Sequence, residues 1–384
     1  MRIVYISTYP PTHCGVGEYT RMLVMALKSI NPSLEIHVFS NIDEGGPERY
    51  DEGAGAYIHP VYTRGSNSYK GVLDKLTEIN GADIVHVQHE YGIFGYTPAI
   101  LKTLLTAKDD GLVKKIVFTM HTIDHPSSIR IKTLEFQSKL NNVDSVIVHS
   151  ILQEFELQNQ GIEPYLIHRI PHGTLLNPYF GTPRFKLAED LGLKEKELSS
   201  IVMTIPGFLR KDKGLDIILD MINYIGGETR FLTLIVAGEL RDRKIKEIVD
   251  EISGSVNTHF IEKYLSHEEI LKLIALADLV ILPYNDPPGK YSVSGILHLA
   301  MGSLKPIVGT RVPRLIELYQ FSPRLVVSPR NPRELARKIL WLTENYDLAV
   351  AYMSSLYAYS IRTNWVRMAR RHYNLYSQLL VNQY

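Results

Sequence analysis

Residues 201–214 read IVMTIPGFLRKDKG, and the fold class is predicted from them. The first six of these residues are mostly apolar or β-branched, which is typical of a buried strand. A glycine ends the run, and a short charged turn then leads into residues 215–225, whose apolar periodicity predicts a helix. A strand, a glycine-containing turn and a helix in this order begin a βαβ unit. The stretch therefore predicts the start of an α/β domain with a parallel sheet.

The same alternation continues on both sides of this stretch. Towards the C-terminus, strands are predicted at 232–237, 279–282 and 306–308, and helices at 245–252, 267–277 and 292–301. Towards the N-terminus, strands are predicted at 3–7, 35–40, 84–88, 116–120, 145–149 and 166–170, and a helix at 16–29. The pattern pauses in a predicted linker within 177–198. We therefore expect two α/β domains with a cleft between them, the first spanning 1–180 and the second 181–361.

Composition limits the class of partner. The 42 lysines and arginines nearly balance the 41 aspartates and glutamates, so the charge does not indicate a nucleic-acid partner. Cys14 is the single cysteine and no apolar run approaches the length of a membrane span, so we expect a cytoplasmic protein. Lys102, Lys108, Lys114 and Lys115 raise the alternative of peripheral membrane contact, although a solvated face is the simpler interpretation.

Glycines follow the first predicted strand of the N-terminal half. Gly15 and Gly17 lie in the loop before the helix at 16–29, where the backbone and the unpaired N–H groups of the helix are able to approach an anion. Glu18 follows within the same helix. In a parallel sheet, ligands bind at the carboxyl ends of the strands. The loop is therefore a candidate site, with a tight turn as the alternative interpretation.

Histidines follow three later strands of the same half. His89, Glu90 and Tyr91 come after the strand at 84–88, His121 after the strand at 116–120, and His172 after the strand at 166–170. A His–Glu pair at a strand end is able to orient sugar hydroxyls or move a proton. An internal hydrogen bond that fixes the loop is the alternative. The spacing of these residues matches no short metal-ligand motif, so no metal is expected.

The loop at 207–214 carries the strongest signal for an anion. Gly207 ends the strand, and Arg210 and Lys213 stand just before a predicted helix N-terminus. Cations beside glycines at such a position form a phosphate-binding arrangement. A solvated basic turn is the alternative interpretation.

Several segments, in order, resemble the retaining family 4 glycosyltransferases. They are the Gly15-Val16-Gly17 loop, Asp83-Ile84-Val85-His86, Thr119-Met120-His121, Ile170-Pro171-His172-Gly173, Leu209 to Asp216, Ala277 to Pro283, and Asn364 to Ala369 with Tyr373 and Tyr376. The resemblance covers nearly the whole chain. It implies the α/β fold named GT-B, with two Rossmann-like domains facing each other across a cleft and a final helix at 362–384 returning to the N-terminal domain.

The resemblance also implies roles for individual residues. Catalytic roles fall to His121, Arg210 and Lys213; donor-binding roles to Gly15, Gly17, Gly207, Ser292, Ser294 and Gly295; and acceptor-binding roles to Glu18, His89, Glu90, Tyr91 and His172. Two departures stand out. The family places paired glutamates where this chain has Tyr291 and Leu299, and an arginine where it has Phe208.

These features lead to one main hypothesis and two alternatives. The main hypothesis is a retaining enzyme that moves a glucose- or mannose-type hexose from a nucleotide sugar to a glycan, lipid or small-molecule acceptor, without a cofactor. Because the paired glutamates are missing, a glycoside phosphorylase on the same fold is the first alternative. A sugar- or nucleotide-binding subunit without catalysis is the second.

Overall fold

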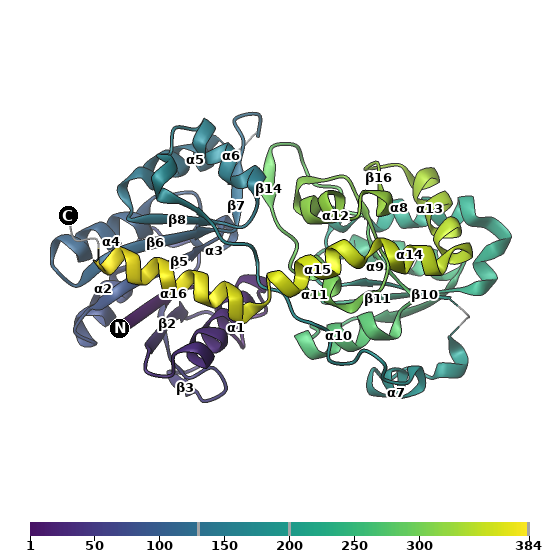
Figure 1. Cartoon of the computed structure of the whole chain (residues 1–384), viewed down its shortest axis with the longest axis horizontal. Coiled ribbons are helices and arrows are strands. Elements are labelled where there is room, and N and C mark those ends of the chain that lie inside the picture. Colours follow the sequence, from purple (N-terminus) through teal and green to yellow (C-terminus); the bar gives the residue numbers. More distant parts are fainter. Residues whose placement is uncertain (129–130, 199–200, 382–384) are drawn as a thin grey trace. The chain divides into compact units, whose positions relative to one another are not determined.

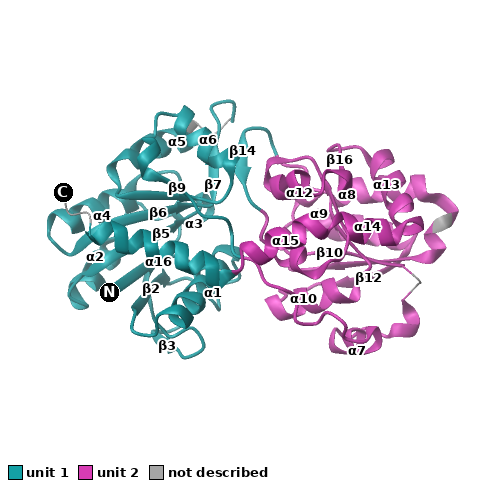
Figure 2. Cartoon of the chain, in the orientation of Figure 1, with its two compact units in different colours: residues 1–173, 287–293, 365–384 teal, residues 174–286, 294–364 magenta. Residues whose placement is uncertain are grey.

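The computed structural model describes residues 1–128, 131–198 and 201–381, and the chain divides into two compact units (Figure 2). Unit 1 consists of Met1–Gly173, Pro287–Val293 and Trp365–Tyr384, and unit 2 consists of Thr174–Asp286 and Ser294–Asn364. The first boundary therefore lies after Gly173, where the sequence analysis placed it after residue 180. The segment 287–293 belongs to unit 1, although the sequence analysis assigned it to the second domain.

Unit 1 is built on an eight-stranded sheet with the order β3-β4-β2-β1-β5-β6-β8-β9. Its strands are β1 (Arg2–Ile6), β2 (Glu35–Asn41), β3 (Arg49–Asp51), β4 (Ala56–Tyr62), β5 (Ala82–His89), β6 (Val113–Met120), β8 (Ser145–Val148) and β9 (Ile167–Arg169). All neighbouring pairs are parallel except β3 with β4. A separate two-stranded antiparallel ladder joins β7 (Thr122–Asp124) to β14 (Lys290–Ser292).

Helices cover this sheet (Figure 1). They are α1 (Gly15–Ile30), α2 (Lys70–Glu78), α3 (Tyr91–Phe94), α4 (Ala99–Asp109), α5 (Ile131–Gln137), α6 (Ile151–Asn159) and α16 (Trp365–Val381). The last of these, α16, packs along α1. Its Tyr376 hydroxyl lies 2.9 Å from the Tyr5 hydroxyl and 2.6 Å from His86 Nδ1, and all three side chains are buried. The C-terminal helix is therefore an integral part of unit 1.

Unit 2 contains a six-stranded parallel sheet with the order β12-β11-β10-β13-β15-β16. Its strands are β10 (Ile201–Pro206), β11 (Leu232–Ala237), β12 (Asn257–Ile261), β13 (Leu279–Leu282), β15 (Ile307–Thr310) and β16 (Val326–Val327). Its helices are α7 (Arg184–Asp190), α8 (Leu215–Ile225), α9 (Lys244–Ser253), α10 (His267–Leu276), α11 (Gly295–Ala300), α12 (Ile316–Phe321), α13 (Pro332–Glu344), α14 (Tyr346–Tyr352) and α15 (Ser354–Arg362).

The predicted element pattern is found in both units. Residues 201–206 form β10, in which all residues after Ile201 are buried, and α8 begins and ends where its periodicity predicts. Two interpretations were wrong. The predicted linker at 177–198 contains α7, and the helix predicted at 292–301 begins only at Gly295 because residues up to Ser292 are hydrogen-bonded as β14 to β7.

Candidate functional site

The first cluster of candidate residues surrounds the N-terminus of α1 in unit 1. Cys14, the residue before the helix, makes no side-chain hydrogen bond to it, so no side chain at this position caps the first-turn N–H groups. A Cβ atom on Gly17 would lie 3.2 Å from the carbonyl carbon and oxygen of Thr8, which explains how the helix packs so closely on the loop after β1. A Cβ atom on Gly15 would meet nothing within 4 Å, so this side of the loop is open. Glu18 lies in the first turn and is partly exposed.

Tyr19 lies at the centre of an aromatic cluster beside this loop. The centroid of its ring is 4.9 Å from that of His121, 5.2 Å from that of His149, 4.9 Å from that of His172 and 5.1 Å from that of Trp365. Trp365 is the first residue of α16, so both ends of the chain contribute to the cluster. The structure thus brings together two predicted site residues, His121 and His172, with three that the sequence analysis did not select.

His121 is held in a defined orientation. Its backbone N–H donates to the His89 carbonyl at 3.0 Å, and its Nε2 lies 3.0 Å from Gln88 Oε1. A carbonyl oxygen only accepts, so Nε2 carries the proton of the neutral ring and Nδ1 is the acceptor nitrogen. Burial, and secondly the neighbouring His149, lowers the pKa of His121 well below its usual value. His121 is therefore neutral at physiological pH.

Several buried polar atoms near these strand ends have no hydrogen-bond partner among the described residues. The set comprises Thr8 Oγ1, Tyr19 OH, Gln88 Nε2 and His149 Nε2. Buried polar groups in proteins are nearly always paired, and an unpaired one costs about 1–3 kcal/mol. Thr8 follows β1, Tyr19 lies in α1, Gln88 lies in β5 and His149 follows β8. The carboxyl ends of these strands form the edge where parallel sheets bind ligands. The unpaired atoms mark this edge of unit 1 as a place for a polar ligand.

Three of the predicted acceptor residues have internal partners instead. His89 is fully buried, stacked 4.3 Å from the Phe136 ring and 5.5 Å from the Phe94 ring. Glu90 caps α3 through Tyr91 N–H at 3.1 Å and accepts from Thr122 Oγ1 at 2.7 Å. The Tyr91 hydroxyl donates to Gln137 Oε1 at 2.8 Å. No hydrogen bond joins His89 to Glu90 among the described residues, so the internal His–Glu bond of the alternative interpretation is not formed, and Glu90 and Tyr91 are held by other partners.

The second cluster lies in unit 2, in the loop between β10 and α8. Gly207 ends the strand with a φ of +101°, beside the side chain of Ile296. Residues Lys211–Lys213 form a 3₁₀ turn that ends at Gly214, whose φ of +71° places it in the left-handed region that favours glycine. Lys213 is 6% exposed, and its Nζ donates to the Tyr284 hydroxyl at 2.8 Å and lies 4.1 Å from that ring's centroid.

The Tyr284 hydroxyl continues this chain of contacts. It lies 3.1 Å from Ser294 Oγ, which accepts from the Leu297 N–H at 3.2 Å and so caps α11. Gly295 is the exposed first residue of that helix. Ser292, which the sequence analysis grouped with these two, lies instead in β14 of unit 1 opposite Thr122. The structure therefore separates Ser292 from Ser294 and Gly295.

An ion network supports the same loop. Arg314, which the sequence analysis did not select, is 6% exposed, pairs with Asp212 at 2.8 Å and also contacts Asp286. Burial opposes the charge on Arg314, but Asp286 and Asp212 raise its pKa above the usual value. Arg210 is about half exposed and pairs with Asp212 at 3.2 Å. The two arginines therefore hold Asp212, and Arg210 remains accessible.

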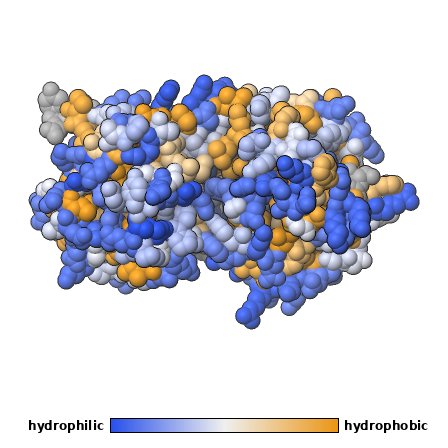
Figure 3. All heavy atoms as spheres, turned by 90° about the horizontal axis from the view of Figure 1, so that it is seen from below, coloured by the Kyte–Doolittle hydropathy of each residue, from blue (hydrophilic) through white to orange (hydrophobic). Residues whose placement is uncertain are grey.

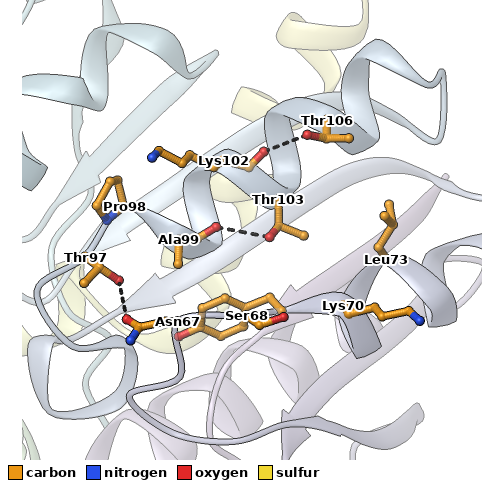
Figure 4. Close-up of a pocket in the computed structure, with 11 residues that line it drawn as sticks. Asn67, Ser68, Lys70, Leu73, Thr97, Pro98, Ala99, Lys102, Thr103 and Thr106 are labelled. Atoms are coloured by element: carbon orange, nitrogen blue, oxygen red, sulfur yellow. Dashed lines mark hydrogen bonds between the residues drawn. The ribbon is translucent and has the colours of Figure 1, made fainter.

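One groove lies elsewhere, between α2 and α4 of unit 1 (Figure 4). Its volume is about 490 Å³, and it contains none of the predicted site residues. The hydroxyls of Thr103 and Thr106 donate to carbonyls one helical turn earlier, and the Lys70 and Lys102 side chains point away from each other (Figure 4). These polar groups do not converge on one point. Volume alone therefore does not identify the functional site.

Neither a metal cluster nor a membrane span is found in the described part of the chain. Residues 1–128, 131–198 and 201–381 contain no group of three His, Cys, Asp or Glu side chains able to hold a metal ion. No described helix has the length and apolar character needed to cross a membrane. Of the lysines considered for membrane contact, Lys108 pairs with Asp144 at 2.7 Å and Lys114 with Asp83 at 2.6 Å. Apolar residues on the face shown in Figure 3 are interspersed with hydrophilic ones.

Two family models match the sequence. The model described as "Glycosyltransferase Family 4" matches residues 14–176, and the model described as "Glycosyl transferases group 1" matches residues 200–345. The first match includes the Tyr19 cluster apart from Trp365, and the second includes the Lys213 loop. Among proteins of curated function, none matches the sequence.

Solved structures of similar fold align along nearly the entire chain. HepE of Anabaena, in complex with UDP and glucose, has a TM-score of 0.75 and 17% identity and covers 98% of this chain and 100% of its own. A glycosyltransferase of Rickettsia africae has a TM-score of 0.75 and 16% identity, with coverage of 100% and 99%. WaaG, a glycosyltransferase of lipopolysaccharide biosynthesis, has a TM-score of 0.70 and 14% identity, with coverage of 98% and 100%. These likenesses confirm the predicted GT-B fold.

Proposed function

The chain belongs to the family 4, group 1 glycosyltransferases, and we propose that it moves a glucose- or mannose-type hexose from a nucleotide sugar to a glycan, lipid or small-molecule acceptor, with retention of configuration. In this proposal the donor's diphosphate binds at the Lys213 loop of unit 2. The acceptor contacts the Tyr19 cluster of unit 1.

The buried Lys213 ammonium carries this proposal. Among the described residues, no carboxylate lies within ion-pair distance of Lys213, and its ammonium donates to the hydroxyl of Tyr284. Burying a charge without an opposite charge is costly, and burial lowers the pKa of Lys213. Tyr284 offsets part of that effect. An anion that binds here would supply the missing charge, and a diphosphate has the required chemistry.

The same loop suits the chemistry of glycosyl transfer. Negative charge develops on the diphosphate as its bond to the sugar breaks, and fixed cations stabilise that charge in the transition state. Lys213 would supply a positioned cation and Arg210 an accessible one, with Gly207 allowing close backbone approach. UDP-glucose has been observed bound to HepE of Anabaena, which supports a nucleotide-sugar donor for this chain as well.

The residues of unit 1 would act on the acceptor and at the reacting carbon. The neutral His121 ring presents Nδ1 as a hydrogen-bond acceptor, which is suited to a sugar hydroxyl. His172 and Glu18 are partly exposed beside the same cluster. His89, Glu90 and Tyr91 would act indirectly, by holding the segment after β5.

The missing glutamates define the alternative. Tyr291 lies in β14, and Leu299 is buried in the core of unit 2, so neither offers a carboxylate to a donor ribose or sugar. A glycoside phosphorylase would have no need of ribose contacts, because its donor lacks the nucleoside. This observation keeps phosphorolysis as the second candidate.

A thermal-shift panel followed by turnover distinguishes these functions. The panel contains nucleotide sugars, free nucleotides, sugar 1-phosphates and inorganic phosphate. A ligand at a hundred times its Kd stabilises the folded state by about 2.7 kcal/mol, which raises Tm measurably. We expect one nucleotide sugar to raise Tm and to support transfer. Stabilisation by sugar 1-phosphate or phosphate alone would identify the phosphorylase, and no response to any ligand would contradict both.

A further inference from the structure

The side-chain nitrogen of Gln153, in the first turn of α6, contacts two separate segments of unit 1. Its side chain is fully buried. The Nε2 atom lies 3.1 Å from the Met120 carbonyl oxygen, 3.2 Å from that of His121 and 3.4 Å from that of Tyr291. The amide nitrogen therefore lies close to the backbone carbonyls at the end of β6, of the first residue after it, and of the middle residue of β14.

The other end of the same amide fixes its own helix. Gln153 Oε1 accepts from the N–H of His149 at 3.0 Å and from that of Ser150 at 3.1 Å, and Ser150 in turn caps α6. The donor and acceptor ends of one side chain thus perform different tasks. The oxygen holds the turn between β8 and α6, whereas the nitrogen holds the carbonyls of other segments.

The segment that Gln153 holds is a detour from unit 2. The chain leaves unit 2 after Asp286, runs through 287–293 in unit 1, and re-enters unit 2 at Ser294, which caps α11. Within the detour, Tyr291 pairs with Ile123 in the ladder between β14 and β7, and the His125 N–H donates to the Gly289 carbonyl at 2.8 Å.

Two further glutamines form hydrogen bonds to the backbone of β7. Gln137 receives the Asp124 N–H at its Oε1 at 2.8 Å and donates from Nε2 to the Asp124 carbonyl at 2.9 Å. Gln160 donates to the same carbonyl at 2.7 Å. Amide side chains thus satisfy the backbone of β7 where no strand is available, and β14 pairs with β7.

We propose that Gln153 is a positioning residue for the transfer reaction. Its side chain holds the backbone after β6 at His121 and the detour at Tyr291 in a single arrangement. The inference rests on the proposed function, because His121 matters to catalysis only there. A change of Gln153 alters the rate through these two segments and without contact with the substrate.

The test exploits the two ends of the amide. Gln153→Glu keeps an oxygen for the His149 and Ser150 N–H groups but replaces the donor nitrogen with an oxygen facing three carbonyls. We expect amide hydrogen exchange at 290–292 to accelerate at least tenfold, with protection of residues 154–159 in α6 retained. We also expect kcat to fall at least tenfold. Gln158→Glu, the same change at an exposed position of α6, is the matched control and should match the wild type.

Several outcomes would overturn the proposal. Wild-type kcat and wild-type exchange at 290–292 in Gln153→Glu would do so, as would an equal loss of protection across α6 and β14, which indicates a general structural role. If Gln153→Glu does not fold, Gln153→Met removes the same donor without adding charge and is read by the same criteria. Exchange is measured without substrate, so an inactive wild type would refute the proposed function, while faster exchange would still show that Gln153 holds the detour.

Discussion

Lys213 Nζ and the Tyr284 hydroxyl lie 2.8 Å apart inside unit 2, and the ammonium also lies over the ring of Tyr284. The tyrosine is fully buried, so its orientation is fixed by packing. The hydroxyl of Tyr284 also lies 3.1 Å from Ser294 Oγ. One phenol thus connects a buried cation to the residue that caps α11.

Replacing Tyr284 with phenylalanine should move the alkaline limit of activity. The ring stays, but Lys213 loses the hydrogen bond that offsets the effect of burial on its pKa. The pKa of Lys213 should therefore fall further, and its cationic form should be lost at a lower pH. We expect kcat/KM for the nucleotide sugar to decline at lower pH than in the wild type. An unchanged pH profile would show that the hydroxyl has no influence on the lysine.

Replacing Lys213 with alanine should reduce transfer at least a hundredfold. The change removes the positioned cation that is proposed to stabilise the leaving diphosphate. Steady-state kcat/KM with the donor identified in the thermal-shift panel measures the effect. Lys211→Ala is the matched control, because Lys211 is exposed in the same 3₁₀ turn and should lose less than threefold. Equal losses in both variants would indicate a general electrostatic effect of the loop.

Replacing Arg314 with methionine should destabilise the protein even without a ligand. Asp212 and Asp286 would keep their negative charges with their buried cation removed. Breaking a buried ion pair on one side costs about 3–5 kcal/mol. Urea unfolding should show a loss of this size. Arg311→Met, an exposed position three residues earlier, should change the free energy of unfolding by less than about 0.5 kcal/mol.

The sequence predicted the framework of both units because local signals and tertiary contacts agree there. Residues 201–206 and 215–225 are apolar in the pattern of a strand and a helix, and both are found at those bounds. The strand-end rule also led to His121 and His172, which lie in the Tyr19 cluster. Applied with equal weight to the strand at 145–149, the same rule would have selected His149.

Other features depend on contacts that no local pattern encodes. Residues 292–294 have the spacing of a helix, but Ser292 pairs with Thr122, which is far away in the sequence. His89 and Glu90 look like a catalytic pair in sequence, yet His89 stacks on Phe136 and Glu90 accepts a hydrogen bond from Thr122. The residues beside Arg314, such as Pro313, give no sign of its role. That role comes from its ion pair with Asp212, about a hundred residues earlier. Long-range pairing decided each of these cases.

Replacing His89 with phenylalanine should stabilise the protein and preserve activity. Both ring nitrogens of His89 are buried without hydrogen-bond partners among the described residues, and aromatic rings surround it. An apolar ring removes the cost of the unpaired nitrogens, about 1–3 kcal/mol. Thermal unfolding at pH 8 measures the gain, and turnover tests the role in acceptor binding that the resemblance implied. A large loss of kcat/KM with a stable fold would restore that role.

The stability of the wild type should fall as the pH drops from 6.5 towards 4. Burial lowers the pKa of His149 and of His372 to about 4 and that of His89 to about 3. Between these values and 6.5 the unfolded chain binds protons that the folded chain does not, so the free energy of unfolding decreases as the pH falls. Burial raises the pKa of Glu317 to about 7. The folded chain therefore binds a proton at Glu317 before the unfolded chain does, and this one group increases the free energy of unfolding as the pH falls.

This pH dependence can be assigned to a single residue by measuring the same variant at two pH values. At pH 5, His89 is still unprotonated in the folded chain but protonated in the unfolded one, so the gain from His89→Phe should be about 2 kcal/mol larger than at pH 8. Urea unfolding at both values measures the difference. An equal gain from His89→Phe at both pH values would mean that the folded chain protonates His89 as readily as the unfolded one.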